Sequence, residues 1–451
     1  MSTTMKEPQL SSGRRQQPLP HSYRSISKRS LAVVCFAAGL SAVTVCSSSH
    51  AAGESGGLYT MEGIVQLALE YNPAMTVAQG FIDQQRGRQT AAGAYPNPSV
   101  TGNVGYGRIR EGGKADIQGP GTPQSIAESN MTVGQPLEWP AMRAARQRAA
   151  DAGVATANAG FAEARLHLIA QVKVAFYDLL LAQQNANLAR QNLDIVEGVA
   201  RIVKARVKSG EAPQFESIKA EVEVLKARQL LVRADNFVRI NRVVVDTLTG
   251  GKLGLAYSVE GDFAGMPKEI QLDSLMTRML NQHPTLQRLL QSVEQSEWKV
   301  EFERQARVPS ITVNGSYWRE IGREAYQGGL TIPTPIWYRR QGEIASALGS
   351  KRREEAELVR ARNELVRAIH QHYQDTRTTA ELIEVFDRGL LRQAQEALRL
   401  AQFSFQQGAS SLLEVLDAQR VQRQIQMDYA QARYELSVSL TRLERAVGGQ
   451  L

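Results

Sequence analysis

The stretch AYPNPSVTGNVGYG, residues 94–107, decides the fold class. After two prolines, the apolar side chains Val100, Val104 and Tyr106 all occupy even-numbered positions, with small or polar residues between them. Alternation with a period of two predicts a β-strand. The chain on both sides is rich in Ala, Leu, Gln, Arg and Glu, which favour helices. The sequence therefore predicts a mainly α protein that also contains a β-strand, and the presence of that strand needs an explanation.

That reason begins with an internal tandem repeat. EYNPAMTVAQG around Pro73 is echoed by NQHPTLQRLLQ around Pro284, and YPNPSVTGNVGYG is echoed by ARVPSITVNGSYW, each at an offset of 211 positions. The offset later falls to 197 or 198, because the first copy has a longer loop, GRIREGGKADIQGPGTPQSIAE. Its Gly, Pro and charged residues are typical of a solvent loop. We place the repeats at residues 52–270 and 271–451.

Each repeat is expected to hold two strands, a long helix, a tight turn and a return helix. The long helices are expected over residues 142–208 and 338–407, and the first would extend about 100 Å. Their apolar positions recur at spacings of seven and four, which favours helices packed side by side as extended coiled coils. The remaining elements are expected as strands near 98–107, 129–137, 309–318 and 326–336, and as return helices over 212–248 and 411–447.

The first 51 residues have the pattern of a secretory signal peptide. Basic residues precede the apolar segment LAVVCFAAGLSAVTV, which is too short to span a bilayer comfortably, and small residues follow it. Cleavage near Ala51 is expected, with lipidation of Cys46 as the alternative. Removing these residues lowers the formal net charge from +8 to +3, because they carry six Lys or Arg and one Glu. The basic excess is therefore mostly a targeting feature, and we expect no nucleic-acid partner.

Counting strands explains why they are present. Four antiparallel strands cannot close a barrel, and single-chain outer-membrane barrels begin at about eight strands. Three copies of the chain supply about twelve strands, an even number that closes around an aqueous lumen. Apolar side chains on one face, with aromatics such as Tyr106, Tyr317 and Tyr326 near strand ends, suit a wall between lipid and water. The expected fold is mainly α with a β-barrel part.

Several motifs, taken with the repeat, resemble the TolC-type outer-membrane factors of tripartite efflux pumps and secretion systems. They are LALEYNPAM, AYPNPSV, PTPIWYRRQGEIA, GASSLLEVLDAQR and LERAVGG. The details of AYPNP and RRQGEIA are most like the branch that serves cobalt-zinc-cadmium pumps. The resemblance covers essentially the whole chain after the signal peptide. It implies a homotrimer in the outer membrane, surrounded by outer-membrane lipid, in which a 12-strand barrel joins a periplasmic tunnel of helices.

The resemblance also implies a function and its partners. The channel would passively export what an inner-membrane transporter and a periplasmic adaptor protein deliver, with metal cations as one candidate cargo. In the family, Gly-containing turns at the ends of the long helices meet the adaptor. The adaptor-docking residues are therefore expected to be Ser209, Gly210, Glu211, Gln407, Gly408 and Ala409.

A periplasmic gate is implied in the same way. Well-known members of the family carry acidic residues six and nine positions after the second turn glycine, and Glu414 and Asp417 occupy these places here. Three copies would set six carboxylates around the entrance. Lys219 is the expected partner that helps to hold the resting channel shut. The alternative is that both acidic residues belong to an ordinary solvated helix face.

No catalytic constellation, cofactor motif or metal site is found in the sequence. His370 and His372 are two positions apart and would face different sides of a helix, whereas metal sites on helices use partners three or four apart. We therefore expect no enzymatic activity and no cofactor. Two alternative functions stay open, a periplasmic coiled-coil scaffold in which the strand segments are loops, and the outer-membrane duct of a protein secretion system. Metal ions, drugs and proteins all remain candidate substrates.

Overall fold

The computed structural model describes residues 57–108, 125–265, 270–320 and 323–451. The expected signal peptide, with its cleavage near Ala51 or lipidation at Cys46, lies outside these residues, as does most of the long loop between the first two strands. Within the described ranges, no helix is both long and apolar enough to cross a membrane.

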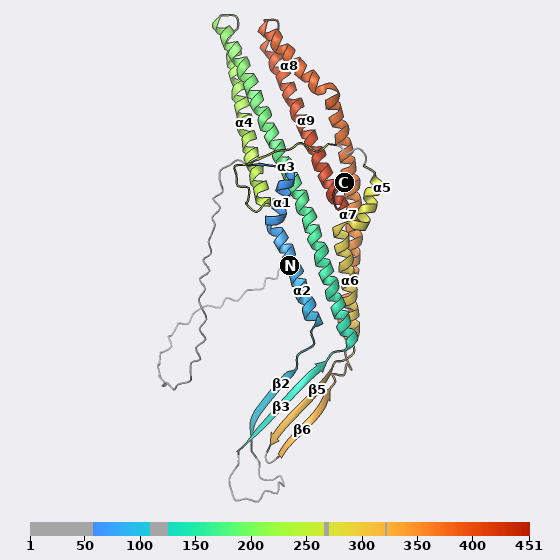
Figure 1. Ribbon diagram of the computed structural model, residues 1–451. Helices are drawn as coiled ribbons and strands as arrows, with labels where there is room; N and C mark the ends of the chain where they lie inside the picture. The colour runs from blue at the N-terminus through green and yellow to red at the C-terminus, as the bar shows by residue number, and fades with distance from the viewer. Residues whose placement is uncertain (1–56, 109–124, 266–269, 321–322) are drawn as a thin grey trace, which may run out of the picture. The chain divides into compact units, whose positions relative to one another are not determined.

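From β2 onward, the first half of the chain follows the predicted order of elements (Figure 1). It comprises β1 (Leu58–Tyr59), α1 (Met61–Tyr71), α2 (Pro73–Gly93), β2 (Ser99–Arg108), β3 (Ser125–Leu137), α3 (Pro140–Lys208) and α4 (Gln214–Leu248). Helix α3 runs without interruption for 69 residues. Strand β3 begins inside the segment expected to be a loop, because it pairs with β2 along the whole of that strand.

The second half repeats this order with one difference. After β4 (Ser258–Val259), which lies near the end of the first half, it comprises α5 (Leu272–Gln282), α6 (Pro284–Gln305), β5 (Ile311–Glu320), β6 (Arg323–Thr331), α7 (Gln341–Val385), the π-helical segment η1 (Phe386–Leu390), α8 (Leu391–Gln406) and α9 (Leu412–Val447). Strand β4 pairs in parallel with β1 and so ties the segment between the halves back to the start of the described chain.

The difference is a break in the second long helix. The prediction of one helix over 338–407 is wrong at Gly389, whose φ of 151° and ψ of −9° are not helical. Glycine is the residue that tolerates such a backbone, and π-helical segments are a recognised way of bending a helix. The bend is held against α9, where the Tyr429 hydroxyl donates to Asp387 Oδ1 at 3.1 Å.

Strand β6 also ends earlier than expected. The sequence predicts a strand near 326–336, but the pairing stops at Thr331. Pro333 and Pro335 follow closely, and proline has no backbone N–H to donate to a neighbouring strand. The apolar alternation that continues through Ile332 therefore does not extend the strand.

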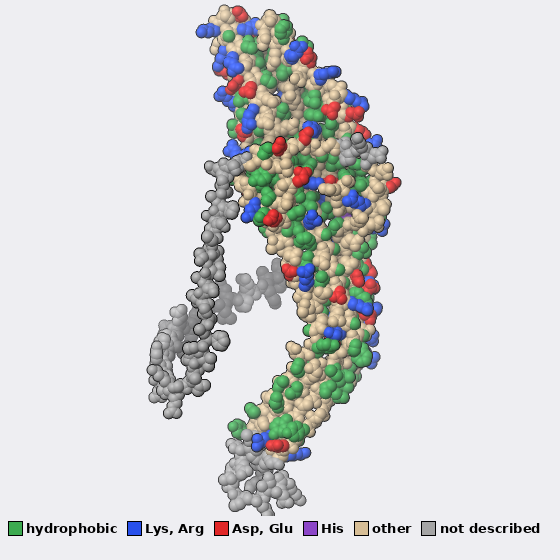
Figure 2. Space-filling model, in the orientation of Figure 1, with side chains coloured by type: hydrophobic (Ala, Val, Ile, Leu, Met, Phe, Trp, Pro, Cys, Tyr) green, Lys and Arg blue, Asp and Glu red, His purple; other side chains and the backbone are tan. Residues whose placement is uncertain are grey.

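Four strands form one antiparallel sheet in the order β2-β3-β5-β6, and its two faces differ. Figure 2 shows few charged side chains over the sheet except near its far end. The register places Val100, Val104, Met131, Val133, Val313, Tyr317, Tyr326 and Leu330 on one face, and Ser99, Thr101, Asn103, Asn130, Thr132, Asn314, Ser316 and Gln327 on the other. The first face is apolar and the second is polar. Trp318 is an exception, because this large aromatic residue lies on the polar face, paired with Asn130.

Each face behaves as its composition predicts. On the apolar face, Val104 and Tyr326 are 89% and 84% exposed in the single chain. The Tyr326 ring contacts its cross-strand neighbour Tyr317, at 5.2 Å between ring centres. On the polar face, the Thr132 and Ser316 hydroxyls lie 3.0 Å apart across two strands. Exposed apolar side chains opposite hydrogen-bonded polar ones indicate a sheet placed between lipid and water.

The helices pack as one layer whose neighbours come from both halves of the chain. In the half of the layer beside the sheet, the helices follow the order α2, α3, α6, α7, and each contacts the next. In the half farther from the sheet, the order is α4, α3, α9, α8. Three apolar clusters join them. The first centres on α1, α3 and α4, the second on α5, α6, α7 and α9, and the third on α3, α4, α8 and α9.

A half-buried carboxylate joins the two halves between α3 and α6. Glu163 on α3 accepts a hydrogen bond from Thr285 Oγ1 at 2.8 Å and forms an ion pair with Arg288, both on α6. Its burial alone would raise the pKa of Glu163. Hydrogen bonds from His167, Thr285 and Arg288 outweigh that effect and lower the pKa to about 2.

We expect Glu163→Gln to lower the free energy of unfolding at neutral pH by up to about 3 kcal/mol. Because the pKa is lower in the folded protein, this contribution is complete above the unfolded value of 4.5 and is lost as the pH falls toward 2. Denaturant unfolding in detergent between pH 2 and pH 7 measures it. The control is Asp83→Asn on α2, an exposed carboxylate, which should change little. Parallel stability profiles for wild type and Glu163→Gln would contradict the assignment.

Candidate functional site

The two helical hairpins end in matching turns. Gly210 after α3 and Gly408 after α8 have φ values of 79° and 74°, the left-handed conformation that favours glycine at the end of a helix. In the first turn the Glu211 amide donates to the Arg206 carbonyl at 2.8 Å, and in the second the Ala409 amide donates to the Ser404 carbonyl at 2.8 Å. This is the Schellman pattern, in which glycine accommodates the reversed backbone.

The residues expected to dock an adaptor are all on the surface of these turns. Ser209 and Gln407 end their helices, and each is followed by the left-handed glycine and one further turn residue. All six residues, Ser209, Gly210, Glu211, Gln407, Gly408 and Ala409, are exposed. The turns therefore present mostly backbone and small or polar side chains to a partner.

Arg206 connects the two turns, a role that no motif in the sequence predicts. Its Nη1 donates to the Phe405 carbonyl at 3.4 Å, and its guanidinium lies 5.2 Å from the centre of the Phe405 ring. Its Nε is also 3.9 Å from Glu211 Oε2. A basic residue in the last turn of a helix was the available signal, but such residues commonly serve only their own helix end.

The third apolar cluster lies beneath the turns and fixes their spacing. Val203 from α3 and Val415 from α9 are completely buried, and Phe405 and Leu412 are 2% and 3% exposed. These side chains come from both hairpins. The two turns are therefore held as one unit at the end of the helices that is farthest from the sheet (Figure 1).

The expected gate carboxylates lie on the exposed side of α9, just after the second turn. Glu414 belongs to the helix start, because Ser411 Oγ accepts from the Glu414 amide at 3.4 Å and lies 3.1 Å from Glu414 Oε1. Asp417 forms an ion pair with Arg420 at 3.4 Å, with both side chains 63% exposed. The single chain thus places both carboxylates in solvent, one turn apart.

Lys219 lies on α4, on the other hairpin. Within the described part of one chain, the ion pair of Asp417 is with Arg420, and the hydrogen bonds of Glu414 are with Ser411. The single chain therefore does not bring Lys219 to either carboxylate. A pairing of Lys219 with these groups stays a prediction for the assembled channel.

A buried polar contact lies just after the two carboxylates along α9, and the sequence does not predict it either. Gln419 on α9 hydrogen-bonds to Asn192 on α3, and the two side chains are only 6% and 4% exposed. A buried side-chain amide costs free energy unless it has a hydrogen-bond partner. Because these two amides serve as partners for each other, they fix the register of α9 against α3. Neither residue stands out in the sequence, because Asn and Gln are usually found on helix surfaces.

The histidines differ in role. His283 is only 3% exposed, and its Nδ1 accepts from the Thr285 amide at the start of α6. Burial lowers the pKa of His283 despite a hydrogen bond to the Arg445 carbonyl. In the part of the chain that the structure describes, no three His, Cys, Asp or Glu side chains are grouped as metal ligands.

The family described as outer membrane efflux protein matches residues 64–251 and 275–449. The chain belongs to the outer membrane efflux protein family. The two matched segments fall in the two halves of the tandem repeat, and they include both hairpins, both turns and all four strands of the sheet. The protein is therefore an efflux channel of the outer membrane with a periplasmic helical tunnel.

Individual relatives agree with this assignment. The efflux protein is 26% identical over 397 residues to the cobalt-zinc-cadmium resistance protein CzcC of Cupriavidus metallidurans, a match that covers 88% of this chain and 91% of that one. It is 22% identical over 406 residues to the pyoverdine export outer membrane protein OpmQ of Pseudomonas aeruginosa, covering 86% and 83%. The CmeC outer membrane channel of Campylobacter jejuni has the same fold, with a TM-score of 0.72, 17% identity and coverage of 86% and 85%.

These findings decide between two of the predicted alternatives. A coiled-coil scaffold requires the strand segments to be loops, whereas they form a sheet with continuous register. Family membership also favours an efflux channel over a scaffold. The protein resembles channel proteins rather than enzymes.

Proposed function

We propose that this efflux protein is the outer-membrane duct of a tripartite pump. In this proposal a homotrimer passively exports metal cations that an inner-membrane transporter and a periplasmic adaptor deliver. The observation that carries it is a four-stranded sheet, apolar on one face and polar on the other, with unpaired edges at β2 and β6. Such a sheet needs copies of itself to close a channel in a membrane.

The edges of the chain support head-to-tail closure. Strand β2 and helices α2 and α4 form one edge and belong to the first repeat, taken as residues 52–270. Strand β6 and helices α7 and α8 form the other edge and belong to the second repeat, taken as residues 271–451. Because opposite edges come from different repeats, one chain's first edge can meet its neighbour's second edge and generate a ring.

Apolar stripes on both helical edges support the same closure. On α4, Phe215, Ile218, Val222, Leu225 and Val232 are between 44% and 70% exposed. Their spacing of three, four, three and seven places them on one side of α4, opposite the buried Ala220 and Ala227.

The other edge carries a matching stripe. Leu382 and Val385 on α7 and Leu400 and Phe403 on α8 are between 50% and 59% exposed. Exposed apolar stripes of this length mark helix interfaces.

The substrate assignment rests on the relatives. CzcC is a cobalt-zinc-cadmium resistance protein and has the higher identity of the two relatives compared, which favours divalent metal cations. OpmQ exports pyoverdine, so an organic substrate is the second candidate. Protein export remains the third, as the duct of a secretion system.

The first experiment measures assembly. The purified protein in detergent should have the mass of three chains by light scattering or native mass spectrometry. Val222→Gln with Leu225→Gln should shift it toward single chains, because the α4 stripe would no longer be apolar. Arg228→Gln, which alters an exposed side chain on another side of α4, should leave three chains. A wild-type mass of one or two chains would contradict the proposed closure into a three-chain ring.

The second experiment tests docking at the turns. Gly408→Trp should abolish export in cells that contain the pump partners while membrane insertion and trimer mass are retained, because a bulky side chain covers the docking surface. Asn tolerates the left-handed backbone, so Gly408→Asn controls for strain in the turn and should retain much of the export. Loss of the trimer in Gly408→Trp would show that the glycine is only structural.

The third experiment tests the gate. Glu414→Ala with Asp417→Ala should lower the cation selectivity and the cation block of single-channel currents, because three copies would lose six entrance carboxylates. Asp428→Ala removes an exposed carboxylate farther along α9 and should change neither property. Unchanged selectivity and block in the double variant would assign both carboxylates to the helix surface and leave the channel function intact.

A further inference from the structure

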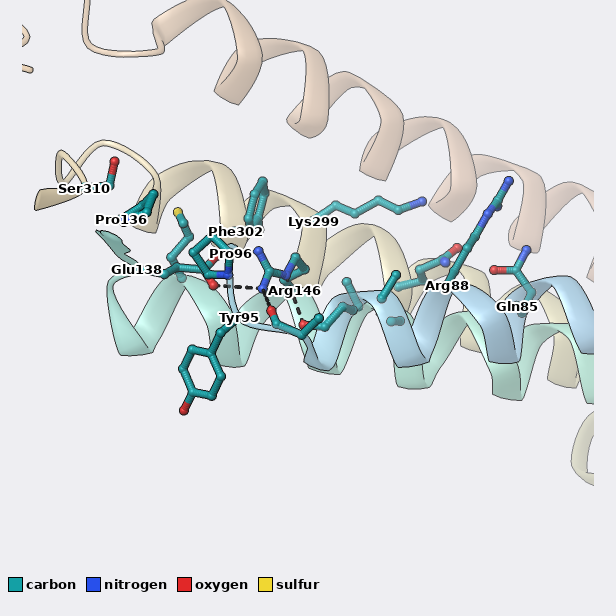
Figure 3. A pocket seen from close by; sticks show the side chains of 17 residues that line it. Gln85, Arg88, Tyr95, Pro96, Pro136, Glu138, Arg146, Lys299, Phe302 and Ser310 are labelled. Atoms are coloured by element: carbon teal, nitrogen blue, oxygen red, sulfur yellow. Dashed lines mark hydrogen bonds and ion pairs between the residues drawn. The ribbon is translucent and has the colours of Figure 1, made fainter. Parts of the chain in front are cut away.

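A cavity of about 770 Å³ lies where the helices meet the sheet (Figure 3). Its walls come from α2, α3 and α6, which belong to different halves of the chain, and from the ends of the strands. Four of its lining residues are charged, namely Arg88, Glu138, Arg146 and Lys299. The family-derived expectations place functional residues only at the turns, at the opposite end of these helices.

One of the three cationic side chains in the cavity, that of Arg146, is already paired within the chain. Arg146 forms an ion pair with Glu138, with an Nη2 to Oε2 distance of 2.8 Å. Its Nε also donates to the Ala92 carbonyl at 3.0 Å, near the end of α2. Figure 3 shows the Arg146 side chain turned toward Glu138. Arg146 and Glu138 therefore neutralise each other and hold the junction of α2 and α3 together.

The other two cations have no such partner. Within the described residues, no ion pair includes Arg88 or Lys299, whereas the neighbouring cations Arg86 and Arg304 pair with Asp83 and Glu301. Figure 3 shows both side chains on the same side of the helices, with Lys299 extending toward Arg88. The cavity thus carries two positive charges, on α2 and α6, that no ion pair within the described residues neutralises, although Glu354 is near enough to attract Lys299.

The two charges are close enough to affect each other. Desolvation lowers the pKa of Lys299 most, and the cations of Arg88 and Arg353 lower it further, against the opposing effect of Glu354. A lowered lysine pKa means that the charged form is held at a cost in free energy. A bound anion would remove that cost.

The register of the sheet indicates which side the cavity faces. Pro136, which lines the cavity, pairs with Thr312 in the β3–β5 ladder. These two residues continue the series of Gly134 with Asn314 and Thr132 with Ser316, which is the polar face. Ser310 and Glu138 lie just past the ends of this series and also line the cavity. The cavity therefore adjoins the polar face of the sheet.

We propose that this cavity is an oxyanion-binding site on the lumen side of the channel, at the base of the barrel, for carboxylate or phosphate groups of small solutes. The proposal rests on closure of the chain into a duct, which makes the polar face the lumen wall. An Arg guanidinium binds two oxygens of one oxyanion in a fork, and a Lys ammonium adds a point charge beside it. Three chains would set six cations around the lumen.

The site has a consequence for transport. The proposed entrance carries carboxylates and would attract cations, whereas the base of the barrel would attract anions. A cargo with both a metal ion and oxyanion groups, such as a metal carboxylate complex, would meet favourable charge at both ends. The chemical class that the site recognises is the small oxyanion itself.

The test is block of single-channel currents by citrate in planar bilayers. Wild-type current should be blocked in a concentration-dependent way, and Arg88→Gln with Lys299→Gln should weaken the apparent citrate affinity by about tenfold or more, as loss of two charge-assisted contacts predicts. The matched control is Arg86→Gln with Arg304→Gln, which removes equal charge from the same two helices outside the cavity. It should behave as wild type.

Three outcomes would overturn the proposal. Equal citrate block in the double variant and wild type would mean that the cavity does not bind oxyanions. Retention of anionic phosphatidylglycerol that depends on Arg88 and Lys299, without citrate block, would mean that the cavity faces lipid headgroups. Citrate block lost equally in the control would mean that only overall charge matters.

A separate measurement distinguishes failure of the site from failure of the duct. The sequence has no Cys after Cys46, so Lys299→Cys introduces one thiol into the channel wall. A membrane-impermeant anionic thiol reagent should reduce current in this variant if position 299 faces the lumen. A wild-type protein that forms no channel would refute the proposed duct, whereas a conducting channel without thiol or citrate sensitivity would refute only this site.

Discussion

The unpaired edges of a four-stranded sheet are the constraint on which the rest of the structure depends. In a bilayer, every backbone N–H and C=O group at a strand edge must find a partner, because lipid offers none. Strands β2 and β6 are such edges. The ladders within the chain satisfy the inner strands only. The two-faced sheet, the repeat that puts β2 and β6 in different halves, and the apolar stripes on α4 and on α7 and α8 all serve the same closure.

Most of the fold could be predicted from the sequence because its signals are periodic and repeated. The alternation in residues 94–107 and its echo in the second half locate the strands, and the absence of proline from residues 142–208 predicts the length of α3. Gly210 and Gly408 were found because each ends a long apolar periodicity and occupies the same place in both repeats. A signal that occurs twice in register is much stronger than either copy alone.

The features that the sequence did not show depend on contacts between distant segments. A glycine within a long helical pattern does not by itself predict a break, but the backbone of Gly389 is not helical and the neighbouring Asp387 is bound by Tyr429 of α9. In the sequence Arg206 resembles an ordinary surface residue, but in the structure its guanidinium lies over the Phe405 ring of the other hairpin. His283 resembled other polar histidines, but the second repeat buries it at a helix start. In each case, tertiary packing outweighed local propensity.

The break at Gly389 gives the two hairpins of each chain different mechanics. Helix α3 is a continuous rod of 69 residues, whereas its counterpart contains a joint at the π-helical segment. A closed ring of three chains would therefore alternate three stiff hairpins with three jointed ones, although the sequence repeat suggests six equivalent ones. In such a ring the tandem repeat would give the helical wall pseudo-sixfold symmetry, and the break at a single glycine in each chain would reduce that symmetry to threefold.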